Sequence, residues 1–255
     1  MAETKKSTFR GRAKAWAAKQ ELHGPQAFFR FVIFTYLDCL AQESDEFVFK
    51  GGNLLWLYIH TPRETIDLDL VTRRLKSTTE VEKVLARATR HAEGIEFNVL
   101  SIKDVTAEGS SGAAVVIVYS TDDGATNKFD LDIVYVLPTK TTTVQSPLTD
   151  KSSIQAATIE NIIADKVAAC HRFGGGNTRM KDYDDLWRIA SERPSVDWGT
   201  VKQLLKGRGF PLELSPEWNN DETSSNWKRH IRPYKDLPKS LSLAINEIND
   251  WLKKA

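Results

Sequence analysis

Two aspartates, Asp67 and Asp69, stand one residue apart in a segment where polar and apolar residues alternate strictly. Successive side chains of a strand point to opposite faces, so these carboxylates are predicted to project together from one face. The apolar residues of the segment are predicted to face a core: Ile66, Leu68 and Leu70. Neighbouring carboxylates repel each other and are costly in a strand unless a cation or solvent accepts them. The pair therefore indicates either a site for Mg²⁺ or Mn²⁺, with substrate phosphates as further ligands, or a solvated edge strand.

A glycine turn precedes the aspartates. Residues 47–49 favour a short strand that stops at Gly51 and Gly52, and apolar residues then recur at helical spacing. Glycines let the backbone approach a phosphate closely, and the N–H groups and dipole of a helix N-terminus attract it. The turn is consequently a candidate phosphate site, although two glycines also occur at strand-to-helix turns for steric reasons alone.

A second alternating segment is predicted as a strand over residues 128–135. Asp130 and Asp132 lie on its polar face. Two-metal phosphoryl-transfer sites commonly use a third carboxylate, which this strand can supply. Solvated strand carboxylates remain the alternative.

A lysine interrupts the apolar stripe of the helix predicted after Thr158. Lys166 lies among Ile159, Ile162, Ile163, Cys170 and Phe173, which are expected to pack. A buried ammonium is costly unless it meets an anion or extends to solvent. In the next helix, Asp182 and Asp185 share one stripe, so this helical hairpin can place Lys166, Lys181 and Asp182 beside one pocket. Acidic residues in a first helical turn are also ordinary partners of the helix dipole.

Taken together, these motifs resemble the AbiEii/AbiGii toxin nucleotidyltransferases, a branch of the DNA polymerase β-like superfamily. The resemblance rests on the glycine turn, on Arg-x-Thr-x-Asp-x-Asp from Arg63, on Glu-Asn-x-x-x-x-Lys from Glu160, and on Arg-x-Lys-Asp-x-x-Asp-Leu from Arg179. One departure is Asn53, where the family usually has Ser or Thr. Asparagine can cap a helix, and its amide can also donate to a phosphate.

The resemblance implies an α/β (α+β) fold with a polymerase β-like core, a small mixed sheet and a helical C-terminal region. It implies three metal ligands, Asp67, Asp69 and Asp132, with Asp130 as the less favoured third. The implied catalytic residues are Asp67, Asp69, Asp132, Lys166 and Asp182. The implied nucleotide-binding residues are Lys50, Gly51, Gly52, Asn53, Arg63, Thr65, Lys166, Lys181 and Asp185.

The resemblance also implies a function. A Mg²⁺-dependent (or Mn²⁺-dependent) enzyme would transfer a nucleotide from an NTP to RNA, with the tRNA 3′ end as the expected acceptor, and so block translation. The protein would act as a toxin in abortive infection or phage defence, alongside a cognate antitoxin. Two alternatives are a nucleotidyltransferase that modifies a protein or small molecule, and a catalytically silent nucleotide-binding module.

The composition is that of a soluble cytoplasmic protein. With 255 residues and 41% hydrophobic content, the chain can bury one large or two small cores, expected as residues 1–145 and 146–255 with a loop over 138–153. The net charge of +1 means that any nucleic-acid surface must be local. Cys39 and Cys170 are expected to be core residues, and neither a signal peptide nor a membrane span is predicted.

Two basic regions are candidates for RNA contact. The first is the N-terminal arm, with Lys5, Lys6, Arg10, Arg12, Lys14 and Lys19. The second lies around Trp218 and Trp227 with Lys228, Arg229, His230 and Arg232, although core packing is the favoured interpretation of these tryptophans. The last predicted helix, residues 240–254, is expected to pack through Leu241, Leu243, Ile245, Ile248 and Trp251.

Overall fold

A mixed sheet organises the first of two units of the chain. The computed structural model describes residues 7–89, 92–107, 110–135, 139–150 and 152–254. The first unit comprises Met1–Leu54 and Arg63–Ala157, and the second comprises Leu55–Pro62 and Thr158–Ala255. The chain thus passes into its helical unit after Ala157, whereas the sequence suggested a boundary after residue 145.

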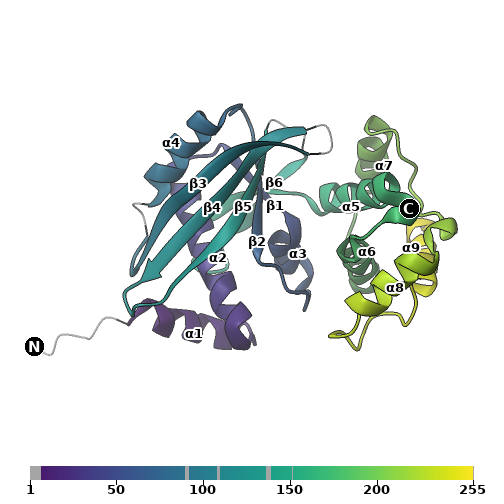
Figure 1. Cartoon of the computed structure of the whole chain (residues 1–255), viewed down its shortest axis with the longest axis horizontal. Helices are drawn as coiled ribbons and strands as arrows, with labels where there is room; N and C mark the ends of the chain where they lie inside the picture. The colour runs from purple at the N-terminus through teal and green to yellow at the C-terminus, as the bar shows by residue number, and fades with distance from the viewer. Residues whose placement is uncertain (1–6, 90–91, 108–109, 136–138, 151, 255) are drawn as a thin grey trace, which may run out of the picture. The chain divides into compact units, whose positions relative to one another are not determined.

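The strands of the first unit follow the order β3-β4-β5-β2-β1-β7-β6 (Figure 1). Two neighbouring pairs, β2 with β5 and β1 with β7, run parallel, and the other pairs are antiparallel. The mixed α/β fold is therefore confirmed. The strands are β1 (Phe47–Lys50), β2 (Asp67–Thr72), β3 (Ile95–Ala107), β4 (Ser110–Thr121), β5 (Thr126–Val134), β6 (Thr141–Gln145) and β7 (Ser153–Ala157).

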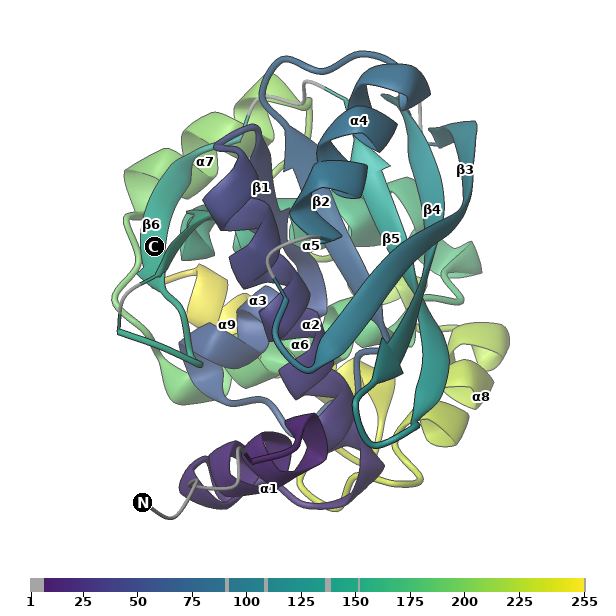
Figure 2. The same cartoon turned by 90° about the vertical axis from the view of Figure 1, so that its left-hand side faces the viewer.

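One face of the sheet is covered by helices. The Tyr36 ring of α2 (Gly24–Glu43) lies 4.9 Å from the ring of Phe97 on β3 and 5.5 Å from that of Phe129 on β5. Helix α4 (Thr78–Ala88) packs on α2 and β3, and both helices lie on the same face (Figure 2). Because the aspartates of β2 and β5 alternate with the buried apolar residues, they project from the opposite face.

Two further helices belong partly or wholly to the first unit. Helix α1 (Phe9–Lys19) packs on α2, and the Phe9 and Phe31 rings lie 5.1 Å apart. Helix α3 (Gly51–Ile59) begins in the first unit, and its residues from Leu55 onward belong to the second.

The second unit is built mainly of helices, and side chains cap the N-termini of α5, α7, α8 and α9. Helix α5 packs on α6 and α7, and α6 also packs on α8 and α9. Thr158, Asp197, Asn220 and Ser240 each accept a hydrogen bond from an amide of the first turn they precede. The helices are α5 (Ile159–Phe173), α6 (Met180–Glu192), α7 (Trp198–Gly207), α8 (Asp221–His230) and α9 (Leu241–Leu252), with short 3₁₀ turns at Gly174–Gly176 and Pro216–Trp218.

Three apolar residues that were expected to pack are exposed. Ile66 precedes β2 and is 72% exposed, Leu243 is 45% exposed and Phe173 is 36% exposed. Ile66 lies before the strand pairing begins, so the alternation of the strand does not govern it. Leu243 and Phe173 belong to helices whose other apolar residues already fill the core.

The predicted loop over residues 138–153 was wrong in its central part. Thr141–Gln145 forms the edge strand β6, which pairs with β7. Its β-branched threonines favour a strand, but an exposed edge carries no apolar alternation that would reveal it. Pro138 and Lys151 lie outside the described residues.

Other expectations about the chain were confirmed. Cys39 and Cys170 are buried free thiols, and Trp227 is fully buried, with its indole N–H donating to the carbonyl oxygen of Pro238. Across the described ranges, no helix combines the length and the apolar character needed to cross a membrane.

Within the N-terminal arm, Lys5 and Lys6 lie outside the described residues. Arg10 pairs with Asp123 at 2.9 Å and Arg12 donates to the carbonyl oxygen of Glu93 at 2.6 Å. These two arginines therefore hold α1 to the first unit.

Candidate functional site

Four aspartates meet across the parallel strands β2 and β5. Asp67 is paired in register with Asp130, and Asp69 with Asp132. Neighbouring strands lie about 4.8 Å apart, so each β2 carboxylate has a carboxylate beside it on β5. The β2 aspartates are half-buried and the β5 aspartates are exposed. The register thus leaves both Asp130 and Asp132 available as the third carboxylate.

This acidic face has the ligand chemistry of a magnesium site. Carboxylate oxygens are the donors that Mg²⁺ prefers, and the mutual repulsion of the four aspartates favours a cation between them. Among the described residues, no three acidic, histidine or cysteine side chains already stand close enough to enclose a metal ion. The side chains would therefore have to turn toward a bound ion.

Gly51 brings the glycine turn against one of these carboxylates. Its φ of +79° lies in the left-handed region that favours glycine. A Cβ atom at Gly51 would lie 1.8 Å from Oδ2 of Asp69, so the carboxylate sits directly over this glycine. Lys50, the preceding residue, is the register partner of Asp69. Backbone conformation and side-chain packing both require glycine at position 51.

Gly52 is held equally tightly, by Arg63 and Thr65. A Cβ atom there would lie 2.3 Å from Nη2 of Arg63 and 2.5 Å from Oγ1 of Thr65. Both side chains are buried, and Oγ1 of Thr65 has no hydrogen-bond partner in the described part of the chain. A guanidinium and an unsatisfied hydroxyl beside the first turn of α3 form a set of donors suited to an anion.

Asn53 has a structural contact that the sequence did not reveal. The side chain is 1% exposed, and its Nδ2 atom donates to the carbonyl oxygen of Asp67 at 2.8 Å. The first turn of α3 is thereby tied to the start of β2. A phosphate contact from Asn53 stays a prediction, whereas its contact with the aspartate strand follows directly from the geometry.

Arg30 on α2 is a residue that sequence reasoning missed. It is 3% exposed. Burial and the positive charge of Arg63 together lower the pKa of Arg30 to about 10, and the negative charge of Glu64 opposes the shift. Two buried guanidinium groups therefore stand near the Gly52 turn, which strengthens its attraction for an anion. The available signal was an arginine inside the otherwise apolar run Phe28–Phe34.

Lys166 is the centre of an ion cluster within the second unit. Its Nζ atom lies 2.8 Å from Oδ1 of Asp182 and 2.7 Å from Oδ2 of Asp185. The two carboxylates are 1% and 0% exposed, and the other oxygen of Asp182 accepts from Nε of Arg179 at 3.1 Å. The Lys166 ammonium therefore meets anions rather than extending to solvent. Lys181 is half-buried in the first turn of α6.

A second buried carboxylate in the same motif holds helices together. Asp184 is fully buried and accepts hydrogen bonds from Nε of Arg188 at 2.6 Å and from Nε2 of His230 at 2.8 Å. Since His230 belongs to α8, this carboxylate ties α6 to α8. The motif that begins at Arg179 therefore contains two kinds of aspartate: those that pair with Lys166 and one that joins two helices. The sequence pattern alone does not tell them apart.

Comparisons with known proteins agree with this chemistry. The family model described as nucleotidyl transferase AbiEii toxin, type IV toxin–antitoxin system, matches residues 35–253. No curated protein matches the chain significantly.

Two crystal structures from Helicobacter pylori share the fold. One is of a protein proposed to be a nucleotidyltransferase: it is 18% identical with a TM-score of 0.56, and the match covers 91% of this chain and 95% of that chain. The other, JHP933, is 21% identical with a TM-score of 0.57 and coverages of 91% and 92%.

We expect Asn53→Asp to lower the free energy of unfolding by about 1–3 kcal/mol, because it replaces a buried donor with an acceptor facing the Asp67 carbonyl. Urea denaturation at neutral pH measures the change. The matched control is Asn98→Asp on β3, where the side chain is exposed and little change is expected. Equal stabilities for the two variants would contradict the structural role of Asn53.

We expect Lys166→Met to lower the free energy of unfolding by about 3–5 kcal/mol, because it leaves two buried carboxylates without their ammonium. Lys253→Met is the control, since that side chain is 76% exposed beside Asp250. Chemical denaturation compares both variants with the parent chain. A stable Lys166→Met variant would show that the cluster contributes little to the fold.

Proposed function

The chain belongs to the AbiEii family of nucleotidyltransferase toxins of type IV toxin–antitoxin systems, and we propose that it transfers a nucleotide from an NTP to the 3′ end of an RNA. The expected acceptor is tRNA, and its modification would block translation in the cytoplasm. Family membership implies an antitoxin partner. Action against phage infection is part of the proposal.

The observation that carries the proposal is the position of the Asp69 carboxylate. It lies over Gly51 at the start of α3 and beside Asp132 in the sheet. A phosphate bound at the helix N-terminus would therefore lie next to carboxylates able to hold its counterion. An acidic strand alone, or a glycine turn alone, would not favour this chemistry over its structural alternatives.

Asp67, Asp69 and Asp132 are the residues proposed to hold Mg²⁺, or Mn²⁺. When bound, the metal would supply charge neutralisation at the reacting phosphates. The amides of Gly51 and Gly52, the Thr65 hydroxyl and the Arg63 guanidinium are proposed to bind the triphosphate, with Lys50 and Asn53 at the border of this group. Arg30 adds a second positive charge near Arg63.

The transfer itself balances as a displacement at the α-phosphorus. The 3′ hydroxyl oxygen of the acceptor forms a bond to this phosphorus, the bond to the β-phosphate oxygen breaks, and pyrophosphate leaves. A carboxylate accepts the hydroxyl proton. Asp132 is proposed for this role because it is exposed, whereas Asp69 is half-buried.

The ion cluster of the second unit is proposed to take part in the same reaction. Lys166 and Asp182 are proposed as catalytic residues, and Lys181 and Asp185 as contacts to the nucleotide. The carboxylates fix the ammonium of Lys166 in one position.

We expect Asp67→Asn and Asp69→Asn each to lower nucleotide transfer by about 100-fold or more, because they remove proposed metal ligands. Each α-labelled NTP is incubated with separate pools of tRNA, total protein and metabolites, with Mg²⁺ or with a chelator. Asp250→Asn, 71% exposed in the second unit, is the control with the same chemical change. If no RNA fraction became labelled, RNA would be refuted as the acceptor.

The same assay separates the two candidates for the third carboxylate. Asp132→Asn is expected to abolish transfer, and Asp130→Asn to retain most of it. Expression of the Asp67→Ala and Asp69→Ala variants in cells is expected to be harmless. Undiminished toxicity of both variants would mean that catalysis is not the toxic mechanism.

A further inference from the structure

A cationic surface surrounds the C-terminal ends of α5 and α7 in the second unit. We define the arginine surface by Arg172, Phe173, Arg179 and Arg208. Arg172 is exposed and Phe173 is 36% exposed, and the guanidinium carbon of Arg179 lies 5.5 Å from the centre of the Phe173 ring. A guanidinium stacked on an exposed aromatic ring presents a flat, cationic face to solvent.

The charges of this surface repel one another. Partial burial lowers the pKa of Arg172, and the positive charges of Arg208 and Arg179 lower it further. Asp165 pairs with Arg208 at 2.6 Å and Asp182 pairs with Arg179 at 3.1 Å. Those carboxylates partly compensate the guanidinium groups of Arg208 and Arg179.

Helix dipoles explain only part of this arrangement. Arg172 lies in the last turn of α5 and Arg208 caps the C-terminus of α7, where positive charge is favourable. Arg179, in contrast, is the N-cap residue of α6, where positive charge opposes the dipole. The Asp182 carboxylate offsets this charge, and both Arg172 and Arg179 remain exposed to solvent.

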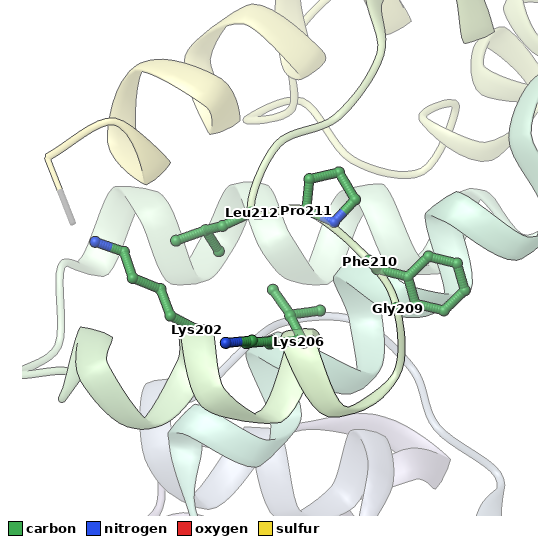
Figure 3. Close-up of a pocket in the computed structure, with 7 residues that line it drawn as sticks. Lys202, Lys206, Gly209, Phe210, Pro211 and Leu212 are labelled. Carbon is green, nitrogen blue, oxygen red and sulfur yellow. The ribbon is translucent and has the colours of Figure 1, made fainter.

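A pocket lies beside α7 (Figure 3). It has a volume of about 440 Å³ and is lined by Lys202 and Lys206, one helical turn apart, and by the apolar residues of the following loop. The Phe210 ring in this loop stacks on His171 at 5.3 Å and 23°, and His171 directly precedes Arg172. The pocket also adjoins the arginine surface through Arg208, which lies between the pocket residues Lys206 and Gly209 in the sequence.

We propose that the arginine surface and the adjoining α7 pocket bind single-stranded RNA, through its phosphates and through stacking of its bases. This inference rests on the proposed function and names a surface for its acceptor. Guanidinium groups match phosphates in geometry, and bases stack on aromatic rings and on guanidinium planes. The chain has a net charge of only +1, so these cations are a local concentration rather than a general property.

The test measures RNA binding by the full-length chain. A fluorescein-labelled single-stranded RNA of 12 nucleotides is titrated at several salt concentrations and followed by anisotropy. The double variant Arg172→Glu with Lys206→Glu is expected to bind the RNA about 10-fold more weakly. The slope of the logarithm of its binding constant against the logarithm of salt concentration is expected to be shallower by about one to two. The matched control, Lys228→Glu with Arg229→Glu, reverses the same charges at exposed positions of α8.

Two outcomes of this titration would overturn the proposal. Weaker binding in the control pair alone would move the RNA contact to α8. Equal competition by poly-L-glutamate of the same length would indicate an acidic protein partner instead of RNA. Circular dichroism of both variants confirms that they are folded.

A kinetic measurement separates this proposal from the proposed function. With labelled NTP, the double variant is expected to raise KM for RNA about 10-fold and to leave kcat and the affinity for NTP unchanged. Transfer with an unchanged KM would refute the surface while the function stands. RNA binding that depends on the surface, without any transfer to RNA, would refute the proposed acceptor while the surface stands.

Discussion

The contact between Asp69 and Gly51 constrains most of the first unit. The carboxylate occupies the space of a side chain at position 51, so β1 must be followed by a glycine with positive φ. That glycine starts α3 against the acidic face of the sheet, and the parallel pairing of β2 with β5 brings Asp132 beside Asp69. Helix α2 covers the other face and leaves the carboxylates away from the core. The glycine turn and its acidic neighbours are thus fixed by backbone geometry rather than by mobile loops.

The polar and apolar alternation of the two acidic segments and the position of the two glycines predicted the acidic face and the glycine turn. The period of two in both acidic segments predicted which residues share a face, because one buried face determines the other. Ile66 shows the limit of this rule, since the alternation continues beyond the point where pairing stops. The contacts of Asn53 and Arg30 could not be predicted, because each depends on a residue distant in sequence whose position only the fold determines.

The ion pairs of the second unit were harder to predict from the sequence because they are buried between packed helices. Lys166 could be recognised as anomalous on an apolar stripe, but its partners depend on how α5 and α6 pack. Asp184 and Asp185 are adjacent and both fully buried, yet one anchors α8 through His230 and the other binds Lys166. Helical periodicity places neighbouring residues 100° apart and therefore predicts different surroundings, but not which of the two is structural.

The distribution of charge in the folded chain bears on the proposed binding of RNA. Arg10 and Arg12 come from the arm that looked most basic in sequence, but they are engaged by Asp123 and by a backbone carbonyl. The arginines of the second unit, in contrast, gather from the ends of three helices, so no run of basic residues announces them. A cluster assembled by packing has an energetic cost from mutual repulsion, which bound phosphates would relieve. Charge density in the folded state, rather than the density of basic residues along the chain, is therefore what determines where an anionic ligand binds.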